Sequence, residues 1–150
     1  MIGFFIQDRI GYKGNKFKLI KIRTYNREEQ ITRFGHICRN TKLDELPQLF
    51  NVFIGDMSFV GPRPDLEGFA DQLKGDDRII LDVKPGLTGP ATIKYMRESR
   101  IISASKMTIP SIEQQLWQDK VHINKEYVEN RNFLLDLKYI FKTFVLLFKN

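Results

Sequence analysis

The chain has 150 residues, of which 42% are apolar and 28% charged. A chain of this length and composition can bury one hydrophobic core, so we expect a single domain over residues 1–150. Intrinsic disorder, collagen-like repeats and a disulfide-stapled miniprotein are excluded. The formal net charge is +6, and the excess lies in residues 9–42, where ten basic residues accompany two acidic ones. Such a positive field attracts anions, which include nucleic acid, anionic lipid and phosphorylated small molecules.

No disulfide, zinc site or membrane span is expected. A single cysteine, Cys38, cannot form an internal disulfide, which fits a reducing compartment, and we expect it to be buried. His36 and His122 lack a second ligand at a metal-binding spacing. The first residues lack the basic and long apolar regions of a signal peptide. The longest apolar run, residues 144–148, is far short of the roughly 20 residues that span a bilayer.

The N-terminal segment is predicted to form a β-hairpin, because apolar and basic residues roughly alternate along it. Its strands are expected over residues 3–7 and 16–23, joined by a turn through the glycine- and asparagine-containing residues 11–15. The alternation predicts one cationic strand face. A polar loop is expected over residues 26–30.

The segment T-K-L-D-E-L-P-Q-L-F-N-V-F, residues 41–53, has the apolar spacing of a helix. Pro47 restricts the start of this helix, because proline is tolerated only in the first turn. Asp44 near the N-cap satisfies that condition and places Asp44 and Glu45 at the positive end of the helix dipole. Thr41 with Asp44 also fits a capping box that begins one turn earlier. Both registers agree with the sequence. The apolar positions are Leu46, Leu49, Phe50 and Phe53.

Glycine and proline punctuate the middle of the chain. V-G-P-R-P, residues 60–64, places Arg63 between two prolines, so its guanidinium is presented from a stiff loop. A helix is expected over residues 65–73 and a short strand over residues 79–83. K-P-G-L-T-G-P, residues 84–90, is expected to be loop throughout.

The C-terminal third is predicted to be helical. Ser111 and Gln114 fit a capping box, with a second helix start near Asp119. In the last segment, residues 133–148, an apolar stripe suits two roles equally, namely packing in the core or lying in a membrane interface. Its members are Phe133, Leu134, Leu137, Ile140, Phe141, Phe144, Val145 and Phe148. The elements together predict an α/β (α+β) fold: a small β-hairpin or sheet, surrounding helices and a C-terminal amphipathic interfacial helix.

Adjacent carboxylates beside a basic segment suit an electrophile that is itself anionic. A carboxylate that attacks a phosphate meets like-charge repulsion, so cations must first neutralise the phosphoryl oxygens. Arg39, Arg63 and Lys84 are the candidates for that role. The alternatives are that Asp44 and Glu45 only cap a helix and that Arg63 is an ordinary surface residue. Because the sequence has no RNA-binding aromatic motif and no zinc-finger spacing, no nucleic acid partner is expected.

Read together, these motifs resemble the bacterial sugar transferase family, the monotopic phosphoglycosyl transferases. The core of the likeness is R-F-G-H-I-C-R-N-T-K-L-D-E-L-P-Q-L-F-N-V-F-I-G-D-M-S-F-V-G-P-R-P, residues 33–64. It extends through F-F-I-Q-D-R-I-G, K-I-R-T, K-P-G-L-T-G-P-A and E-Y-V-E-N-R to the terminal segment. The resemblance therefore covers nearly the whole chain, with highly specific motifs.

The resemblance implies transfer of a sugar-1-phosphate from a UDP-sugar to polyprenyl (undecaprenyl) phosphate, with release of the nucleoside monophosphate. It implies that Asp44 is a nucleophile that forms a covalent phosphosugar intermediate, that Glu45 completes the dyad, and that Mg²⁺ binds beside it, with Asp44 as ligand. Arg39 and Arg63 are implied phosphate contacts, and Lys84 is a weaker candidate for the substrate cleft. The implied setting is exopolysaccharide, lipopolysaccharide or other glycoconjugate biosynthesis at the cytoplasmic face of the bacterial inner membrane, with peripheral attachment through the C-terminal helix.

Two features depart from the family pattern. Family members carry an apolar re-entrant helix before the segment that corresponds to Phe4 and Phe5, where this sequence has three residues. Three explanations fit: a truncated chain, a membrane element supplied by another polypeptide, or a start that was not included. A truncated, non-catalytic fragment that binds a partner or a membrane is the alternative function. In addition, Tyr25 stands where the family usually has methionine after R-T, a change expected to affect packing more than chemistry.

Overall fold

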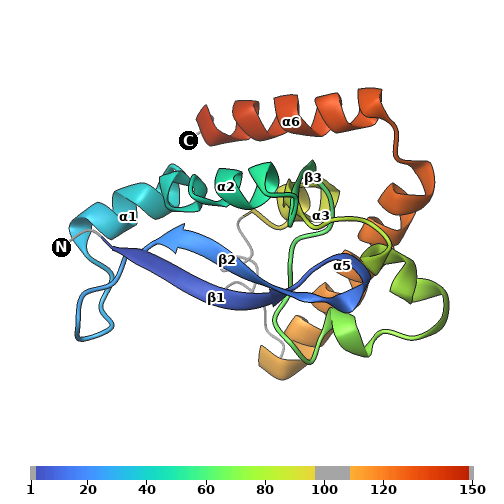
Figure 1. Cartoon of the computed structure of the whole chain (residues 1–150), viewed down its shortest axis with the longest axis horizontal. Coiled ribbons are helices and arrows are strands. Elements are labelled where there is room, and N and C mark those ends of the chain that lie inside the picture. The colour runs from blue at the N-terminus through green and yellow to red at the C-terminus, as the bar shows by residue number, and fades with distance from the viewer. Residues whose placement is uncertain (1–2, 97–108, 149–150) are drawn as a thin grey trace.

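The computed structural model describes residues 3–96 and 109–148, and it has the mixed helical and strand composition that the sequence predicts (Figure 1). Strands β1 (Phe4–Ile10) and β2 (Lys16–Ile22) form the predicted antiparallel hairpin, with Phe4 opposite Ile22 and Ile10 opposite Lys16. A 3₁₀ turn, Tyr12–Gly14, connects them. Lys13 and Gly14 both have positive φ there, 56° and 82°, which produces the tight reversal.

The prediction of a single cationic strand face is wrong, because the basic residues of β2 are divided between its two faces. Lys16 and Lys18 lie on one face and form exposed ion pairs with Glu67 and Asp8. Lys21 lies on the opposite face, the one that carries the buried Leu19. Of the three lysines of β2, Lys21 is therefore the one on the face of the buried Leu19.

Helix α1 (Arg33–Asn40) was not among the predicted elements. The Thr32 side chain caps it by accepting a hydrogen bond from the Gly35 backbone N–H at 2.9 Å. The predicted buried cysteine, Cys38, is confirmed: it lies on the inner face of α1 and is 1% exposed. This cap stabilises the start of α1, because the threonine side chain accepts from a backbone N–H that has no partner within the helix.

The two predicted helix starts around Asp44 are both wrong. Lys42 adopts a left-handed conformation with φ 59°, which interrupts the helical path after α1. Asp44 lies in a separate 3₁₀ turn, Leu43–Glu45, and Pro47 is the N-cap residue of the short helix α2 (Gln48–Phe53). Pro47 lies at the start of α2, in agreement with the restriction of proline to the first helical turn. That restriction does not distinguish a first helical turn from a separate 3₁₀ turn.

Three predictions for the middle of the chain are also wrong. Residues 65–73 contain only a 3₁₀ turn, Ala70–Gln72, because Gly68 has a φ of 94° and breaks the helical path. Residues 79–83 are not a strand, since a 3₁₀ helix, Gly75–Leu81, buries Ile80 and Leu81. The loop predicted over residues 84–90 contains strand β4 (Gly86–Thr88), which pairs in parallel with β3 (Ser58–Val60).

The β3–β4 pair brings two glycine- and proline-rich segments into backbone contact. The Gly86 N–H donates to the Pro62 carbonyl at 2.8 Å, and the Gly61 N–H donates to the Thr88 carbonyl at 2.9 Å. A Cβ on Gly86 would lie 2.1 Å from the Gly61 nitrogen, so no larger residue fits without displacing the backbone. This close packing fixes the G-P-R-P loop that presents Arg63.

We expect Gly86→Ala to lower the free energy of unfolding by about 1–3 kcal/mol, because the added methyl group overpacks a backbone contact. Chemical denaturation of the two proteins measures this difference. Gly3→Ala is the matched control, since its Cβ meets nothing within 4 Å and should leave stability nearly unchanged. Equal stability of both variants would contradict the close-packing account.

The remaining helices complete the fold around a small core. Helix α3 (Pro90–Lys94) follows β4, and α5 (Ile109–Asn130) is one continuous helix without the second start predicted near Asp119. Helix α6 (Phe133–Phe148) follows, with the Asn132 side chain accepting from the Leu135 N–H at 2.9 Å. The core lies between the turn end of the hairpin, the 3₁₀ helix Gly75–Leu81 and α5. Its residues are Ile10, Ala70, Ile80, Leu81 and Val121, with Leu73, Ile79 and Trp117 packed against them.

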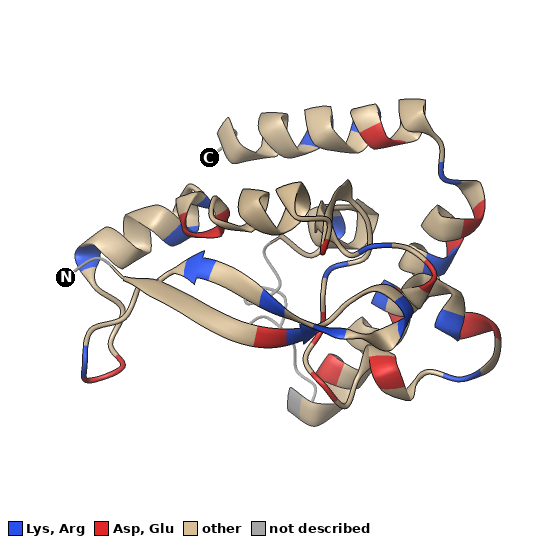
Figure 2. Cartoon of the chain, in the orientation of Figure 1, with Lys and Arg blue, Asp and Glu red and all other residues tan. Residues whose placement is uncertain are grey.

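The apolar stripe of α6 is not part of this core. Leu134 and Phe141 are 75% and 70% exposed, and α6 lies on the same side of the molecule as α1 and α2, opposite the hairpin (Figure 1). The four apolar positions predicted on the α2 segment are exposed as well. Figure 2 shows that α2 has no charged residue and that most of α6 is uncharged. The core-packing interpretation of the stripe is therefore wrong.

In the described ranges, 3–96 and 109–148, none of the helices combines the length and the apolar character needed to cross a bilayer.

Candidate active site

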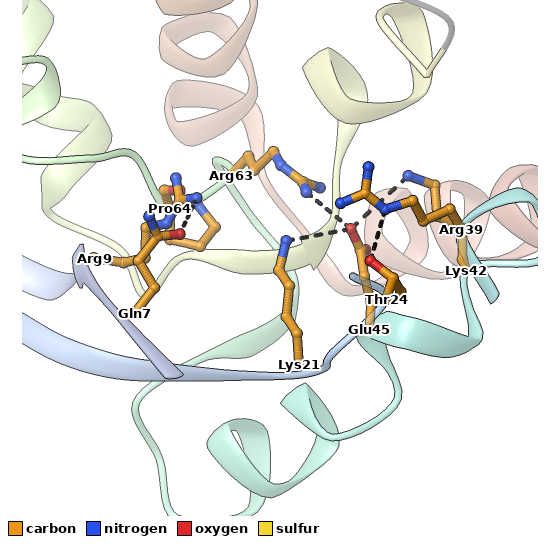
Figure 3. Close-up of polar contacts among 9 residues, drawn as sticks. All are labelled: Gln7, Arg9, Lys21, Thr24, Arg39, Lys42, Glu45, Arg63 and Pro64. Atoms are coloured by element: carbon orange, nitrogen blue, oxygen red, sulfur yellow. Dashed lines mark hydrogen bonds and ion pairs between the residues drawn. The ribbon is translucent and has the colours of Figure 1, made fainter. Parts of the chain in front are cut away.

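The Glu45 carboxylate lies at the centre of a cluster of cations (Figure 3). Arg63 Nη2 donates a hydrogen bond to Glu45 Oε1 at 2.9 Å. The ammonium groups of Lys21 and Lys42 each lie 3.8 Å from the same oxygen. Strand β2, the left-handed residue after α1 and the G-P-R-P loop thus each direct one cation to a single carboxylate.

The loop that carries Arg63 is held rigidly by its neighbours. Arg9 Nη1 donates to the Pro64 carbonyl at 3.3 Å, and the Ile10 N–H donates to the Asp65 carbonyl at 2.9 Å. Together with the Gly86 to Pro62 hydrogen bond, these contacts fix the backbone on both sides of Arg63. The Arg63 side chain is still 43% exposed, so its guanidinium has room to contact a ligand.

Asp44, next to Glu45 in the same 3₁₀ turn, has a different environment. Its residue surface is only 9% exposed, and its Oδ1 atom is buried and makes no hydrogen bond with any part of the chain that the structure describes. Burial and the neighbouring Glu45 charge raise the pKa of Asp44 above its usual value. An anionic oxygen without a hydrogen-bonding partner keeps its lone pairs available to an electrophile or a metal ion.

The two carboxylates are therefore electrostatically distinct. Burial alone would raise the pKa of Glu45, but Arg63, Lys42 and Lys21 together lower it below its usual value. Burial and the nearby Arg63 charge lower the pKa of Lys21 to about 8, so this ammonium remains largely protonated at neutral pH. The surrounding cations thus favour the ionised form of Glu45, whereas burial and the Glu45 charge disfavour the ionised form of Asp44.

Arg39 is fixed by two contacts on α1 and the preceding loop. Its Nε donates to Thr24 Oγ1 at 2.9 Å, and its guanidinium carbon lies 4.4 Å from the centroid of the Tyr25 ring. Gly35 packs against the Thr24 carbonyl, where a Cβ would lie 2.2 Å from the oxygen. Figure 3 draws Arg39, with its hydrogen bond to Thr24, in one view with the cations that contact Glu45. That Arg39 and Arg63 bind the same phosphate stays a prediction.

Lys84 is the predicted cation that the structure does not bring to this cluster. Its side chain is exposed and its ammonium lies beside Gly55, just after the C-terminal end of α2. The carboxylates lie before the N-terminal end of that helix. Lys21 and Lys42 supply the positive charge that was expected from Lys84. Neither lysine was among the site residues predicted from the sequence. The basic residues of β2 were a usable signal for Lys21, whereas the left-handed turn at Lys42 left no readable pattern.

An apolar groove of about 470 Å³ reaches the cluster from the exposed side of α2 and α6. Lys42 and Glu45 lie at its polar end. The walls come from the 3₁₀ turn before α2, from α2 itself, from β3 and from α6; they include Leu43, Leu46, Leu49, Phe59, Ile140, Phe144 and Leu147. A hydrogen bond of 2.6 Å between the Thr88 and Thr143 hydroxyl groups ties α6 to β4 and holds the groove in shape.

The donor set around Asp44 fits a divalent metal only in part. In the described ranges, no three His, Cys, Asp or Glu side chains are placed to hold a metal ion by themselves. Magnesium, however, commonly binds through one or two carboxylates and completes its shell with substrate phosphates and water. The buried Oδ1 of Asp44, which has no hydrogen-bonding partner among the described residues, fits that mode of binding.

Comparison with known proteins identifies the family. The model of the family described as "Bacterial sugar transferase" matches residues 2–150. The chain belongs to the bacterial sugar transferase family. The resemblance indicated by the sequence motifs is therefore confirmed. These motifs contain Arg39, Asp44, Glu45 and Arg63.

Three relatives show the range of the family. The chain is 36% identical over 146 residues to the uncharacterized sugar transferase EpsL of Bacillus subtilis, covering 90% of this chain and 64% of that protein. It is 33% identical over 155 residues to a UDP-glucose:undecaprenyl-phosphate glucose-1-phosphate transferase of Klebsiella pneumoniae, covering 93% and 31%. It is 32% identical over 156 residues to a UDP-N-acetylgalactosamine-undecaprenyl-phosphate N-acetylgalactosaminephosphotransferase of Aeromonas hydrophila, covering 93% and 34%. The chain spans about one third to two thirds of the length of these relatives.

Proposed function

We propose that this protein transfers a sugar-1-phosphate from a UDP-sugar to undecaprenyl phosphate. One observation carries the proposal: a buried carboxylate oxygen, Asp44 Oδ1, lies without a hydrogen-bonding partner in the described structure beside a carboxylate that holds three cations. The names of the Klebsiella pneumoniae and Aeromonas hydrophila relatives support the substrate classes.

The proposed reaction has two displacements at one phosphorus atom. Asp44 Oδ1 attacks the phosphorus that carries the sugar; the bond to the bridging oxygen breaks, and UMP leaves with the electron pair. A phosphate oxygen of the lipid then attacks the same phosphorus, and the bond to Asp44 breaks. The products are a polyprenyl diphosphate sugar and the free Asp44 carboxylate. Both steps need cations, because each brings an anionic nucleophile to an anionic phosphoryl group.

The chain itself supplies those cations. The Arg39 and Arg63 guanidinium groups match the geometry of phosphate oxygens, and each is held by contacts on its own loop or helix. Lys21 and Lys42 add positive charge around Glu45. We propose that Asp44 also contributes one ligand to Mg²⁺, with diphosphate oxygens and water as the others. When bound, the metal would supply further neutralisation of phosphate charge.

The apolar groove suits the isoprenoid chain of the acceptor. Its walls are almost entirely apolar, and its polar end contains Lys42 beside the carboxylates, where a lipid phosphate is needed. An isoprenoid chain that lies in this groove places its phosphate at the end that contains Lys42 and Glu45. The groove therefore connects the exposed apolar side of the molecule to the site of the chemistry.

Nucleotide release tests the proposed function. The protein is incubated with UDP-glucose, UDP-galactose or UDP-N-acetylgalactosamine, with Mg²⁺ and membranes that contain undecaprenyl phosphate, and UMP is measured. We expect UMP release from at least one donor, dependent on the lipid phosphate for repeated turnover. Absence of UMP and of sugar transfer with every donor would favour the alternative, a non-catalytic module that binds a partner or a membrane.

We propose that α6 attaches the protein peripherally to the cytoplasmic face of the bacterial inner membrane. Replacing Leu134 and Phe141 together by serine removes two strongly exposed apolar side chains without disturbing the core. We expect binding to anionic lipid vesicles to weaken at least about tenfold, since a buried apolar side chain contributes roughly 1.5–3 kcal/mol. Vesicle co-sedimentation measures the change. Leu66→Ser is the control, because it removes an exposed apolar side chain that lies beside the hairpin and outside α6. An equal loss of vesicle binding in that variant would contradict a specific role for α6.

Tyr25, the residue that departs from the family pattern, is predicted to help orient Arg39. Stacking of the guanidinium on the ring restricts a side chain that is proposed to bind phosphate. We expect Tyr25→Met to raise the KM for the UDP-sugar about threefold with little change in kcat, and Tyr25→Phe to retain the wild-type KM. Steady-state kinetics at fixed lipid concentration distinguish these outcomes. Equal behaviour of the methionine and phenylalanine variants would show that the ring does not act through Arg39.

A further inference from the structure

Arg63 and Lys42 also line a second, more polar pocket of about 260 Å³. These two cations are shared with the Glu45 cluster. Other lining residues come from α3 and α5 and include Thr92, Trp117 and Asn124. We call this space the Asn124 pocket. It adjoins the apolar groove, and Lys42, Thr92 and Met96 line both.

Two residues that line the Asn124 pocket carry a buried polar atom that makes no hydrogen bond with the described residues. Asn124 is 6% exposed, and its Oδ1 atom is buried without a partner in residues 3–96 and 109–148. The Thr92 hydroxyl oxygen is in the same state. Leaving a buried acceptor unpaired costs stability, so two such atoms at one pocket suggest that a ligand completes them. An amide oxygen accepts only, so the missing partner of Asn124 is a hydrogen-bond donor.

The walls of this pocket are held together before any ligand binds. The Tyr95 hydroxyl donates to Asp119, and Lys94 Nζ donates to the same Asp119 carboxylate at 2.7 Å. The ammonium of Lys120 lies 5.5 Å from the centroid of the Tyr95 ring. These contacts connect α3 to α5, so Thr92 and Asn124 are kept at a fixed separation. A fixed separation of polar groups favours recognition of a rigid ring over a flexible chain.

We infer that the Asn124 pocket binds a hydroxylated sugar ring carried by the donor diphosphate, with Asn124 and Thr92 as the residues that recognise its hydroxyl groups. This inference rests on the proposed function, because the diphosphate is what places the ring next to Arg63 and Lys42. Phosphate oxygens bound by these two cations leave the attached ring directed into the pocket. Sugar hydroxyls donate to Asn124 Oδ1, and the Trp117 side chain lines the same pocket. The ring is either the transferred sugar or the ribose of the nucleotide.

Asn124→Leu tests the inference, because it is expected to weaken ligand binding without lowering the stability of the protein. The substitution keeps the approximate size but removes the unpaired acceptor, so we expect thermal stability to be unchanged or higher. For binding, we expect a five- to tenfold higher Kd, the effect of losing one buried hydrogen bond. Isothermal titration calorimetry with Mg²⁺ and UDP-glucose, UDP-galactose or UDP-N-acetylgalactosamine measures the Kd. The Asp44→Asn protein serves as the parent, so that binding is observed without reaction.

Two further variants keep the test decisive. Thr92→Val is nearly isosteric, removes the second unpaired oxygen, and is expected to raise the Kd as well. Gln118→Leu removes an exposed amide from the same helix outside the Asn124 pocket, and should leave the Kd unchanged. Titration with UMP distinguishes the two rings. If the pocket variants raise the Kd for the UDP-sugars but not for UMP, the pocket binds the transferred sugar. If they raise the Kd for UMP as well, the pocket binds the ribose. Unchanged Kd values in both pocket variants would overturn the inference. A parent protein that binds no UDP-sugar would contradict the proposed function instead.

Discussion

Asp44→Asn is expected to reduce UMP release from the UDP-sugar by roughly 10³-fold or more, because a neutral amide oxygen cannot replace a carboxylate as the attacking group. The substitution preserves size, and Asp44 Oδ1 makes no hydrogen bond within the described residues that would be lost. It also removes a negative charge next to Glu45, whose charge contributes to raising the pKa of Asp44. Folding stability should therefore be retained while activity is lost.

Measurement of UMP release and of the thermal unfolding midpoint on the same preparation separates these effects. Asp76→Asn is the matched control, since Asp76 is an exposed carboxylate in the first turn of the 3₁₀ helix Gly75–Leu81. It should be fully active. An Asp44→Asn protein that releases UMP at the control rate would remove Asp44 from the chemistry, and Glu45 would then be the remaining carboxylate to consider.

Arg63→Met is expected to lower kcat/KM for the UDP-sugar by about 10²–10³-fold, the range seen when one group that stabilises transition-state charge is removed. Arg63 is the only cation within hydrogen-bonding distance of Glu45 Oε1 among the ion pairs of the described residues, and its guanidinium is positioned by a rigid loop. Arg63→Lys should recover part of the activity, because an ammonium keeps the charge but lacks the planar fork of donors.

Steady-state kinetics of both Arg63 variants test this prediction. Arg27→Met removes an exposed arginine from the loop before α1 and serves as the control for the loss of one positive charge. If the Arg63→Met and Arg27→Met proteins lost activity equally, only the general positive field of the protein would matter. A specific phosphate contact by Arg63 would then be contradicted.

The sequence predicts best where local chemistry determines the structure. The hairpin was predictable because alternating residues flank a turn that contains Gly11 and Gly14, and both strands appear within three residues of the expected bounds. Asp44, Glu45, Arg39 and Arg63 were identifiable because their motifs are local and specific. The structure places the Arg63 guanidinium on the Glu45 carboxylate, while the joint action of Arg39 and Arg63 on a phosphate stays a prediction.

Prediction fails where distant segments decide the outcome. Residues 84–90 look like loop, yet β4 forms because the backbones at Gly61 and Gly86 approach closely enough to pair in parallel. Residues 79–83 look like a strand, but Ile80 and Leu81 join the core as part of a 3₁₀ helix. The stripe on α6 reads equally well as core or surface, because periodicity shows that a face is apolar without showing what covers it.

The candidate site shows the same limit. Lys21 and Lys42 are ordinary lysines in the sequence, and their convergence on Glu45 depends on the strand register and on the left-handed residue after α1. Tyr25 was expected to affect packing more than chemistry, and the sequence did not show that its ring lies against the Arg39 guanidinium. The Asn124 pocket has no local motif, since its polar atoms come from α3 and α5.

Covalent trapping is the most direct test of the central claim that Asp44 attacks the donor phosphate. The protein is incubated with UDP-sugar and Mg²⁺ in the absence of lipid acceptor, then examined by intact-protein mass spectrometry and peptide mapping. The account predicts a mass increase of one sugar phosphate, located on Asp44, absent from the Asp44→Asn protein and lost when undecaprenyl phosphate is added. UMP release and sugar transfer without any such adduct, or with an adduct on another residue, would contradict it.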